Sequence, residues 1–585
     1  MSAARAADSL ASGDFDRAVH ASLARLTHGL SPMVLASATA DWLMHLALSP
    51  GKQMDLGVMA ARQALRFQRH LGECTTGRRE PCIRPLPQDR RFDAPHWQQW
   101  PFNLLWQAFL LNQQWWHAAA TDVGGVSHHH ELVVDFAIRQ WLDLVSPSNF
   151  LVTNPEILEQ TLRSGGANLI AGSRNWFDDL SRLLANRPPA GTEAYRPGVE
   201  VAVTPGEVVF RNHLVELIRY TPVTPAVHPE PVLIVPSWIM KYYILDLSPH
   251  NSLVRYLRER GHAVYMVSWR NPDGSDRDLG MDDYLQKGAM AAIDVVWRCH
   301  GGRPIHAGGY CLGGTLLAIA AARLAHEDDQ RLASLSLLAS QVDFSEPGEL
   351  ALFIDEAQLA WLDDLMASQG YLDGKQMAGA FALLNQRDLV FSRMVHDYLM
   401  GRRRPVTDLH AWNADATRMP FRQHREYLQS LYHHNDLAKG RYRVAGKPVA
   451  LSDIRIPLFC LATERDTVSP WRSVYKISLL TDTEVTFCLT SGGHNVGVVN
   501  PPVPHEARAG VSRAYRLATR LEDGKYVDPE AWYSSAPVAE GSWWPAWQAW
   551  LQQHSTAPVV LVALPAAART CASLGAAPGR YVLMP

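Results

Sequence analysis

Cys311 is the residue whose surroundings most clearly indicate chemistry, because it is the centre of the pentapeptide Gly309-Tyr310-Cys311-Leu312-Gly313. A nucleophile in this glycine spacing marks a sharp strand-to-helix turn that exposes a strained side chain above a sheet. The positive end of the following helix favours the thiolate, which is the reactive form of cysteine. The motif therefore predicts a cysteine nucleophile for acyl transfer. A buried, inert cysteine in a glycine-rich turn is the alternative.

A thiol nucleophile needs a base, and the base needs an acid that orients it. His494 follows the last predicted strand, in the turn Ser491-Gly492-Gly493-His494-Asn495, and is the expected base. Asp466 follows an earlier strand and is the expected orienting acid, so the chain order is nucleophile, acid, histidine. Glu464 and Asp453 compete for the role of the acid.

The tetrahedral intermediate of acyl transfer carries an oxyanion, which two backbone N–H groups are expected to hold. One N–H group is expected from Leu312, directly after the nucleophile. The other is expected from Trp238, in the loop Pro236–Met240 that follows an earlier strand. Because backbone groups donate these hydrogen bonds, the side chains of the loop are freer to vary.

The elements that must position these residues form an α/β pattern after residue 196, in which short β-branched runs alternate with helical stretches. Strand, turn and helix occur in the required order around Cys311, which predicts an α/β-hydrolase fold with a mostly parallel sheet. Between residues 342 and 448 the sequence becomes helical and aromatic-rich, which predicts a cap over the carboxyl edge of the sheet. The expected strands are 208–211, 231–235, 263–268, 305–307, 334–339, 457–462 and 485–489.

Residues 1–195 are expected to form a mostly helical N-terminal domain, with helices over 102–114 and 132–145. The stretch 186–198 has the proline and glycine content of a linker, and the catalytic domain is expected to span 196–585. Five tryptophans between residues 97 and 116 favour a packed helical core. An exposed apolar contact surface is the alternative for these tryptophans.

The overall composition argues against several classes of function. Lys and Arg (55) nearly balance Asp and Glu (58), so the net charge of −3 gives no general attraction to nucleic acid. Seven scattered cysteines without a C-x-x-C pair favour a reducing, cytoplasmic compartment. No export signal and no membrane span is expected. The run His128-His129-His130 lacks metal-site spacing and is expected to be a solvated helix end, so no metal and no cofactor are predicted.

Several further segments resemble one family, the polyhydroxyalkanoate (poly-3-hydroxybutyrate) synthases of the single-subunit kind, class I in type with class II as the alternative. Together with Cys311, Asp466 and His494, these segments run from about residue 90 to the end, and the first ninety residues match none of them. The segments are Ser146-Pro147-Ser148-Asn149-Phe150, Lys241-Tyr242-Tyr243-Ile244-Leu245-Asp246-Leu247, Ser268-Trp269-Arg270-Asn271-Pro272, Phe353-Ile354-Asp355-Glu356, Trp412-Asn413, Asp415-Ala416-Thr417, Val499-Asn500-Pro501-Pro502 and Gly541-Ser542-Trp543-Trp544-Pro545.

The resemblance implies repeated acyl transfer from (R)-3-hydroxyacyl-CoA to a growing polyester, with release of CoA. Cys311 would carry the acyl chain, and His494 would deprotonate its thiol and later the 3-hydroxyl of the incoming unit. Asp466 would orient His494 or share the second task. The resemblance also implies a homodimer at the surface of cytoplasmic polymer granules, in the company of granule-associated proteins, and suggests the helical N-terminal domain as the dimer or granule contact.

A few positions depart from the family pattern. Ser237, Trp238 and Met240 are unusual in the oxyanion loop, as are Thr467 after the acid and Asn495 after the histidine. These unusual residues are expected to affect which acyl groups enter the active site more than they affect the type of reaction. Two alternatives share the same motifs: a cysteine-dependent thioesterase or hydrolase, and a catalytically inactive granule-binding homologue. The run Arg402-Arg403-Arg404 is expected to be a solvated face, with contact to CoA phosphates as its alternative.

Overall fold

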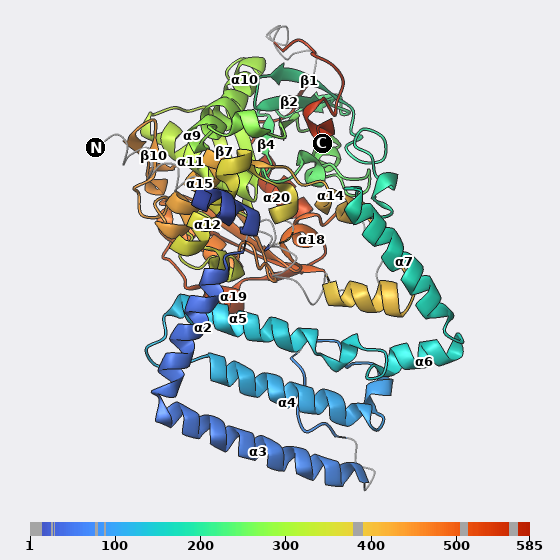
Figure 1. Ribbon diagram of the computed structural model, residues 1–585. Coiled ribbons are helices and arrows are strands. Elements are labelled where there is room, and N and C mark those ends of the chain that lie inside the picture. The colour runs from blue at the N-terminus through green and yellow to red at the C-terminus, as the bar shows by residue number, and fades with distance from the viewer. Residues whose placement is uncertain are drawn as a thin grey trace, which may run out of the picture.

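The computed structural model describes residues 15–24, 27, 30–75, 80–86, 89–377, 379, 390–502, 513–560 and 571–585. A large α/β body and a set of N-terminal helices that extend from it are its two parts (Figure 1). The body is built on a ten-stranded sheet in the order β1-β2-β5-β4-β6-β7-β12-β13-β14-β15. The strand that leads to Cys311, β6 (Ile305–Tyr310), lies in the interior of this order.

The interior of the sheet is parallel, and its two edges are antiparallel. Strands β5, β4, β6, β7, β12 and β13 pair in parallel, while β1, β2, β14 and β15 pair antiparallel. Every residue of β4, β5, β6, β12 and β13 is buried, as expected for strands covered on both faces. The remaining bounds are β1 Gly206–Arg211, β2 Val215–Tyr220, β4 Val232–Val235, β5 Val264–Trp269, β7 Leu332–Leu338, β12 Leu458–Thr463, β13 Val485–Thr490, β14 Ala514–Arg520 and β15 Val538–Glu540.

Helices cover both faces of this sheet. Those of the body are α8 Leu253–Arg258, α9 Met281–Asp283, α10 Ala291–Cys299, α11 Leu312–His326, α16 Trp471–Tyr475, α17 Ile477–Leu480, α18 His494–Val498, α19 Pro529–Ser535 and α20 Trp544–Gln553. Successive residues of a strand point to opposite faces. A side chain at Gly309 would meet Gly314 of α11, whereas one at Gly308 would approach Trp547 of α20. The two helices therefore enclose β6 from opposite sides.

The seven predicted strands and the mostly parallel sheet are confirmed, with shifts of a few residues at their ends. Three strands of the sheet were not predicted: β2, β14 and β15. Charged residues interrupt the apolar pattern by which strands are predicted: β2 carries Glu216 and Arg219, and β14 carries Arg516. Glu216 is nevertheless fully buried, because it pairs with Arg211 and accepts hydrogen bonds from the backbone N–H groups of residues 580 and 581.

A helical segment lies between β7 and β12, where the cap over 342–448 was predicted. Its π-helical turn η10 (Leu428–His433) continues α15 (Phe421–Tyr427), and both contribute side chains beside Cys311. The other elements of the segment are η7 Gly348–Phe353, α12 Glu356–Gln369, β8 Tyr371–Leu372, η9 Met394–Leu399, α14 Asp408–Asn413, β9 Met419–Pro420, β10 Arg443–Val444, β11 Lys447–Pro448 and η11 Leu451–Asp453.

The N-terminal helices form an arm below the body, in which α3, α4 and α5 lie side by side and α6 and α7 lead back to the body (Figure 1). The predicted helices over 102–114 and 132–145 correspond to α4 and α5. Of the clustered tryptophans, Trp97 and Trp106 are buried in the core of the arm, whereas Trp100 is exposed. The bounds are α2 Pro32–Ala47, α3 Pro50–Thr75, α4 Phe102–Ala120, α5 His128–Leu144, α6 Pro155–Arg163 and α7 Ala167–Leu184.

The segment 571–585 lies along the edge strand β1. Leu574 donates its backbone N–H to the carbonyl of Val208, and the N–H of Val208 donates to the carbonyl of Gly575. A disulfide joins Cys571 to Cys299 at the end of α10, with the two Cα atoms 5.9 Å apart. Because 272 residues separate the two cysteines, their spacing in the sequence did not reveal this pairing. Among the described residues, no helix is long and apolar enough to cross a lipid bilayer.

Candidate active site

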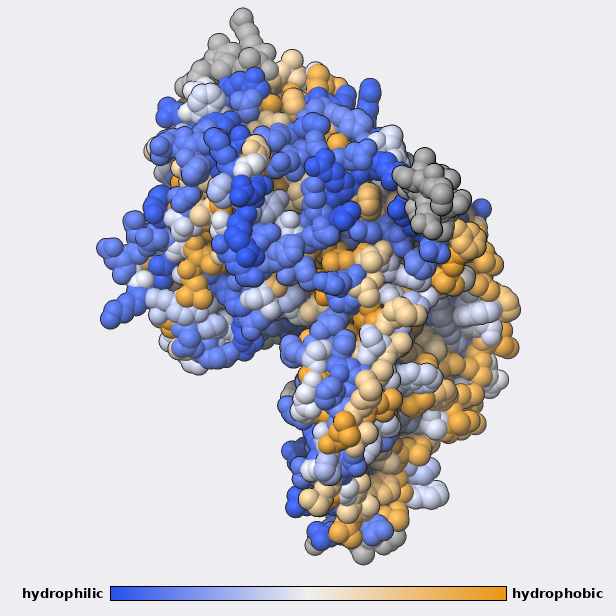
Figure 2. Space-filling view, turned by 60° about the vertical axis from the view of Figure 1, so that its left-hand side comes forward, coloured by the Kyte–Doolittle hydropathy of each residue, from blue (hydrophilic) through white to orange (hydrophobic). Residues whose placement is uncertain are grey.

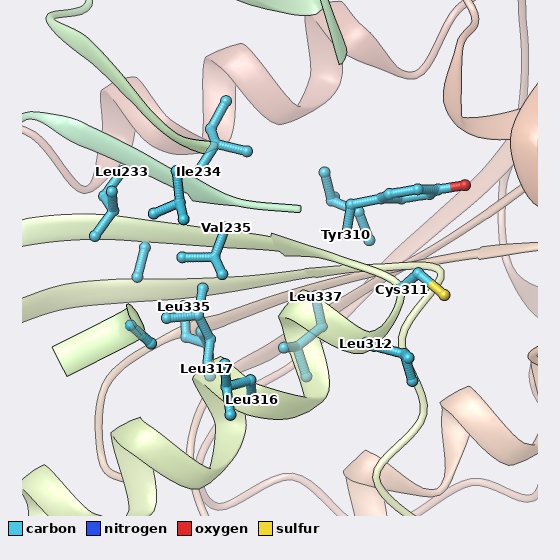
Figure 3. Close-up of a cluster of buried hydrophobic side chains, with 14 of the residues drawn as sticks. Leu233, Ile234, Val235, Tyr310, Cys311, Leu312, Leu316, Leu317, Leu335 and Leu337 are labelled. Carbon is cyan, nitrogen blue, oxygen red and sulfur yellow. The ribbon is translucent and has the colours of Figure 1, made fainter. Parts of the chain in front are cut away.

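Cys311 occupies the sharp turn between β6 and α11, with its sulfur directed away from the sheet (Figure 3). Its backbone has φ +54° and ψ −126°, a conformation that residues with a side chain rarely adopt. Its backbone N–H donates to the carbonyl of Leu338 at 2.9 Å, which ties the turn to the neighbouring strand β7. The turn that the glycine motif predicts is therefore present.

Two glycines of the motif are required by close packing. A Cβ atom at Gly309 would overlap the backbone of Gly314, and one at Gly313 would overlap the backbone carbonyl of Val235. Neither neighbour is a flexible side chain that could move aside. The spacing of the glycines in the sequence thus reflects direct contact between α11 and the strands on either side.

His494 and Asp466 lie together at the carboxyl edge of the sheet. Nδ1 of His494 is 2.8 Å from Oδ2 of Asp466, and the Asp466 side chain is fully buried. Asp466 also accepts hydrogen bonds from the backbone N–H groups of Val468 and Ser469, at 2.9 and 2.8 Å, and from the hydroxyl of Thr463 at 3.1 Å. Hydrogen bonds of this number hold the carboxylate group in a single orientation.

The two competing carboxylates lie elsewhere. Glu464 is exposed to solvent. Asp453 precedes β12, at the opposite end of this strand from Asp466, and its carboxylate lies 3.6 Å from the His326 imidazole. Asp466 is therefore the candidate acid that the structure brings to His494. Because Glu464 is only two residues away in the sequence, spacing alone did not separate it from Asp466.

Cys311 and His494 interact directly. Burial opposes a charged imidazole, but the Asp466 carboxylate and the Cys311 sulfur, each by its charge and by a hydrogen bond, hold the pKa of His494 well above its ordinary value. The Tyr310 ring lies 5.5 Å from the imidazole, and the Tyr310 hydroxyl donates to Oδ1 of Asn495 at 2.6 Å. By contrast, burial raises the pKa of the thiols of Cys460 and Cys488, which disfavours their reactive thiolate form.

The loop Pro236–Met240 is held by its carbonyl groups. The carbonyl of Pro236 accepts from the Trp269 indole at 2.9 Å, and those of Trp238 and Ile239 accept from the hydroxyl and N–H of Thr417 at 2.6 and 3.1 Å. Within the described part of the chain, no group accepts a hydrogen bond from the N–H groups of residues 238, 239 or 312. The side chain of Trp238 is buried, whereas Ile239 and Leu312 line the cavity at Cys311. The oxyanion role of the Trp238 and Leu312 N–H groups stays a prediction.

A polar network that the sequence did not reveal lines the same cavity. The Tyr427 hydroxyl donates to the Tyr432 hydroxyl at 3.0 Å, and Nε2 of Gln341 donates to the same oxygen at 3.3 Å. Gln341 follows β7, whereas the two tyrosines belong to the cap. These residues stand far from Cys311 in the sequence and in no motif, so only the folded cap brings them to the sulfur.

The histidine and arginine runs are used in contacts within the protein. His129 and His130 lie 3.3 and 2.6 Å from carboxylate oxygens of Asp355 and Asp41, and α5 begins at this run. Arg403 pairs with Asp178 and Asp179 of α7, at 2.8 and 3.0 Å. In the described part of the chain, no three His, Cys, Asp or Glu side chains are grouped as metal ligands.

The fold and this geometry define a class, the α/β-hydrolase-fold proteins, here with cysteine at the nucleophile turn. The model for the alpha/beta hydrolase fold matches residues 230–501. Models described as "Poly-beta-hydroxybutyrate polymerase (PhaC) N-terminus" and "Poly-beta-hydroxybutyrate polymerase N terminal" match residues 88–257 and 11–52. The second match corrects the expectation that the first ninety residues lie outside the resemblance.

The chain is 39% identical over 554 residues to the poly(3-hydroxyalkanoate) polymerase of Methylorubrum extorquens, covering 94% of this chain and 89% of that protein. It is 37% identical to the poly(3-hydroxyalkanoate) polymerase subunit PhaC of Cupriavidus necator, covering 84% and 83% of the two chains. The chain therefore belongs to the poly(3-hydroxyalkanoate) polymerase family.

Proposed function

We propose that this protein polymerises (R)-3-hydroxyacyl-CoA into a polyester and releases CoA, with Cys311 as the covalent acyl carrier. The observation that carries the proposal is the hydrogen-bonded pair His494–Asp466 beside Cys311 at the nucleophile turn, in a chain of the polymerase family. No bound cofactor is needed for this reaction, because the thioester substrate is itself activated for acyl transfer.

In the first step, Sγ of Cys311 attacks the thioester carbonyl carbon. His494 takes the thiol proton, and the carbonyl oxygen becomes an oxyanion held by the backbone N–H groups of Leu312 and Trp238. The bond from carbon to the CoA sulfur then breaks, and the CoA sulfur takes the proton from the imidazole. The products are CoA and an acyl thioester on Cys311. Because one thioester replaces another, this exchange is nearly balanced in free energy.

In the second step, the 3-hydroxyl oxygen of an incoming 3-hydroxyacyl-CoA attacks the acyl carbon on Cys311, so that the product is a lengthened acyl-CoA that can acylate Cys311 again. His494 takes the hydroxyl proton, a C–O ester bond forms, and the C–S bond to Cys311 breaks as the thiolate is reprotonated. Repetition of the two steps lengthens the polyester by one unit for each CoA released. Asp466 holds the imidazole in one orientation through both proton transfers.

We also propose that the protein is a cytoplasmic homodimer located at the surface of polymer granules, where the N-terminal arm is the contact region. Figure 2 shows hydrophobic residues gathered along one side of the molecule and over its lower, projecting part. Helix α7 alone exposes Phe177, Leu183 and Leu184 by 63%, 71% and 76%. Exposed apolar area of this kind is typical of a surface that contacts another apolar body.

The experiment that tests the proposed reaction is incubation of the purified protein with 3-hydroxybutyryl-CoA, with CoA release and insoluble polymer measured together. We expect both for the natural protein and neither for Cys311→Ala. Free 3-hydroxybutyrate without polymer would identify a thioesterase and contradict the proposal. CoA release that persists in Cys311→Ala would contradict the acyl-cysteine, and no release by the natural protein would identify an inactive homologue.

A further inference from the structure

A large cavity in the cap adjoins the smaller cavity at Cys311. The larger one has a volume of about 140 Å³, and the smaller one has a volume of about 40 Å³. The two share the side chains of Ile239, Leu312, Leu350, Tyr427 and Tyr432. The larger cavity therefore adds space beyond the cavity in which the acyl unit at Cys311 reacts.

The wall of the larger cavity is mostly aliphatic and aromatic, with few polar side chains. Two of these, Gln358 and Gln376, use their oxygens within the protein, accepting from the N–H groups of Ser31 and Asp373 at 2.9 Å each. The hydroxyl groups of Tyr427 and Tyr432 form a hydrogen bond with each other. A ligand in this cavity would therefore meet an apolar surface, as the hydrocarbon part of a polyester requires.

His424 is the exception in this wall. It lies on α15, is 6% exposed, and its Nδ1 is buried without a hydrogen-bond partner. No hydrogen bond joins its Nε2 to any described residue either. Burial alone lowers the pKa of His424 to about 4, so the imidazole is neutral at physiological pH. A neutral imidazole carries one N–H donor and one acceptor nitrogen, and a buried polar atom without a partner costs about 1–3 kcal/mol. This unused donor points to a ligand.

The helix places His424 at a defined distance along the cavity from Cys311. His424 and Tyr427 are three residues apart on α15, so they lie on the same helix face, separated by about 4.5 Å along the axis. Tyr427 lines both cavities, whereas His424 lines only the larger one. An acyl chain that starts at the Cys311 sulfur would therefore pass Tyr427 before it reaches His424.

We propose that the larger cavity binds the polyester chain attached to Cys311, and that the His424 imidazole donates a hydrogen bond to an ester carbonyl one unit beyond the acyl group that reacts. This inference rests on the proposed polymerase reaction and assigns His424 as a positioning residue for elongation. Ester carbonyls are the strongest hydrogen-bond acceptors in such a chain, and a polyester offers one in each unit. A monomeric 3-hydroxyacyl group on Cys311 has no ester carbonyl of its own, so only a longer chain can use the donor.

The test compares two substrates of the full-length enzyme, 3-hydroxybutyryl-CoA and the CoA thioester of the linear dimer of 3-hydroxybutyrate. Single-turnover CoA release with enzyme in excess gives the acylation efficiency for each. We expect His424→Leu to lower the ratio of dimer to monomer efficiency by threefold or more, as loss of one hydrogen bond predicts. His424→Gln retains an N–H donor and is expected to restore the ratio. Arg425→Lys changes an exposed residue of the same helix that lines neither cavity, and is the matched control with an unchanged ratio.

A ratio in His424→Leu that stays within threefold of the natural value would overturn the inference, as would equal slowing of both substrates. Since leucine removes an unsatisfied polar group, Tm is expected to stay equal or rise, and a variant that fails to fold would show that His424 is structural instead. Failure of the proposed reaction itself is distinguishable, because the natural protein would then form no acyl-cysteine with either substrate.

Discussion

Asp466 is the residue whose hydrogen bonds define the geometry of the active site. Its carboxylate accepts from two backbone N–H groups, one hydroxyl and the His494 imidazole, so both oxygens are used in a fixed direction. The imidazole is consequently held with Nδ1 toward the acid and Nε2 toward Cys311. This arrangement fixes the tautomer that can accept the thiol proton.

Replacement of this carboxylate by an amide tests that role. Asp466→Asn leaves the size of the side chain unchanged but presents an amide to Nδ1, which disfavours the productive tautomer. We expect kcat/KM for 3-hydroxybutyryl-CoA to fall by about 10²–10⁴-fold. Glu464→Gln makes the same chemical change at an exposed position two residues away and is expected to leave kcat/KM unaltered. Equal activity of the two variants in steady-state assays would refute the role of Asp466.

The raised pKa of His494 predicts a pH dependence of stability. A histidine whose pKa is higher in the folded than in the unfolded state stabilises the fold below the unfolded pKa of about 6.5, and this contribution disappears as the pH rises through the folded value. The urea midpoint of the natural protein, relative to that of His494→Gln, should therefore decrease as the pH is raised from about 6 into the alkaline range. A constant difference over this range, measured by circular dichroism, would argue against the raised pKa.

Residue types and spacing predicted the nucleophile, the base and the loop that carries the acid, although spacing alone did not separate Asp466 from Glu464. Cys311, Asp466 and His494 each follow a strand of a parallel sheet, and such strands end at the same edge. Tyr427, Tyr432 and His424 were not predictable in this way, because the cap that brings them to the cavity has no regular period linking it to the sheet.

At the scale of elements, the nucleophile turn depends on the close approach of α11 to β4 and β6. Gly313 is the clearest case, since its Cα faces the carbonyl of Val235. The helix can approach the backbone of this strand so closely only because residue 313 has no side chain. The strain of the Cys311 backbone is therefore maintained by packing on both sides of the turn.

Gly313→Ala is expected to disrupt this packing, because the added methyl group would overlap the backbone of β4. We expect a loss of at least about 3 kcal/mol in the free energy of unfolding, visible as a lower Tm or as insoluble protein. Gly57→Ala is the matched control: Gly57 is exposed in the interior of α3 with open space around it, so alanine should stabilise the helix by up to about 1 kcal/mol. Similar Tm values for the two variants would contradict this account.

Strands with uniform apolar sequence were predicted well, and strands that carry charge were not. Each residue of β4 is buried and apolar, which is readable from the sequence. Glu216 in β2 is buried only because segment 571–585 supplies N–H groups to it from far along the chain. A partner at such a separation is not visible in the local sequence, so the antiparallel strand β2 could not be predicted.

At the scale of the whole molecule, the arm and the body differ in what they expose. The body buries its aromatic residues in one large core, whereas the arm has small cores and many exposed apolar side chains. Such a division of surface suits a protein that keeps its reaction site enclosed while another region contacts an apolar body.

Exposed residues of α7 provide the test of this contact. The triple variant Phe177→Ser, Leu183→Ser and Leu184→Ser is expected to bind preformed poly(3-hydroxybutyrate) particles at least about tenfold more weakly, since each buried apolar side chain contributes roughly 1.5–3 kcal/mol. Arg174→Gln changes an exposed residue of the same helix and should bind like the natural protein. Binding is measured by sedimentation with the particles, and light scattering of both variants reports the oligomeric state. Unchanged partition of the triple variant would exclude α7 from the contact.

The segment that lies along β1 has a consequence for solubility. An uncovered edge strand offers a row of free N–H and C=O groups to which another copy of the protein can add its own strand. Residues 574–577 occupy the groups of Gly206 and Val208 through backbone hydrogen bonds. This edge of the sheet is thus shielded from self-association by the protein's own chain, which matters most for a protein that gathers in high local concentration on one surface.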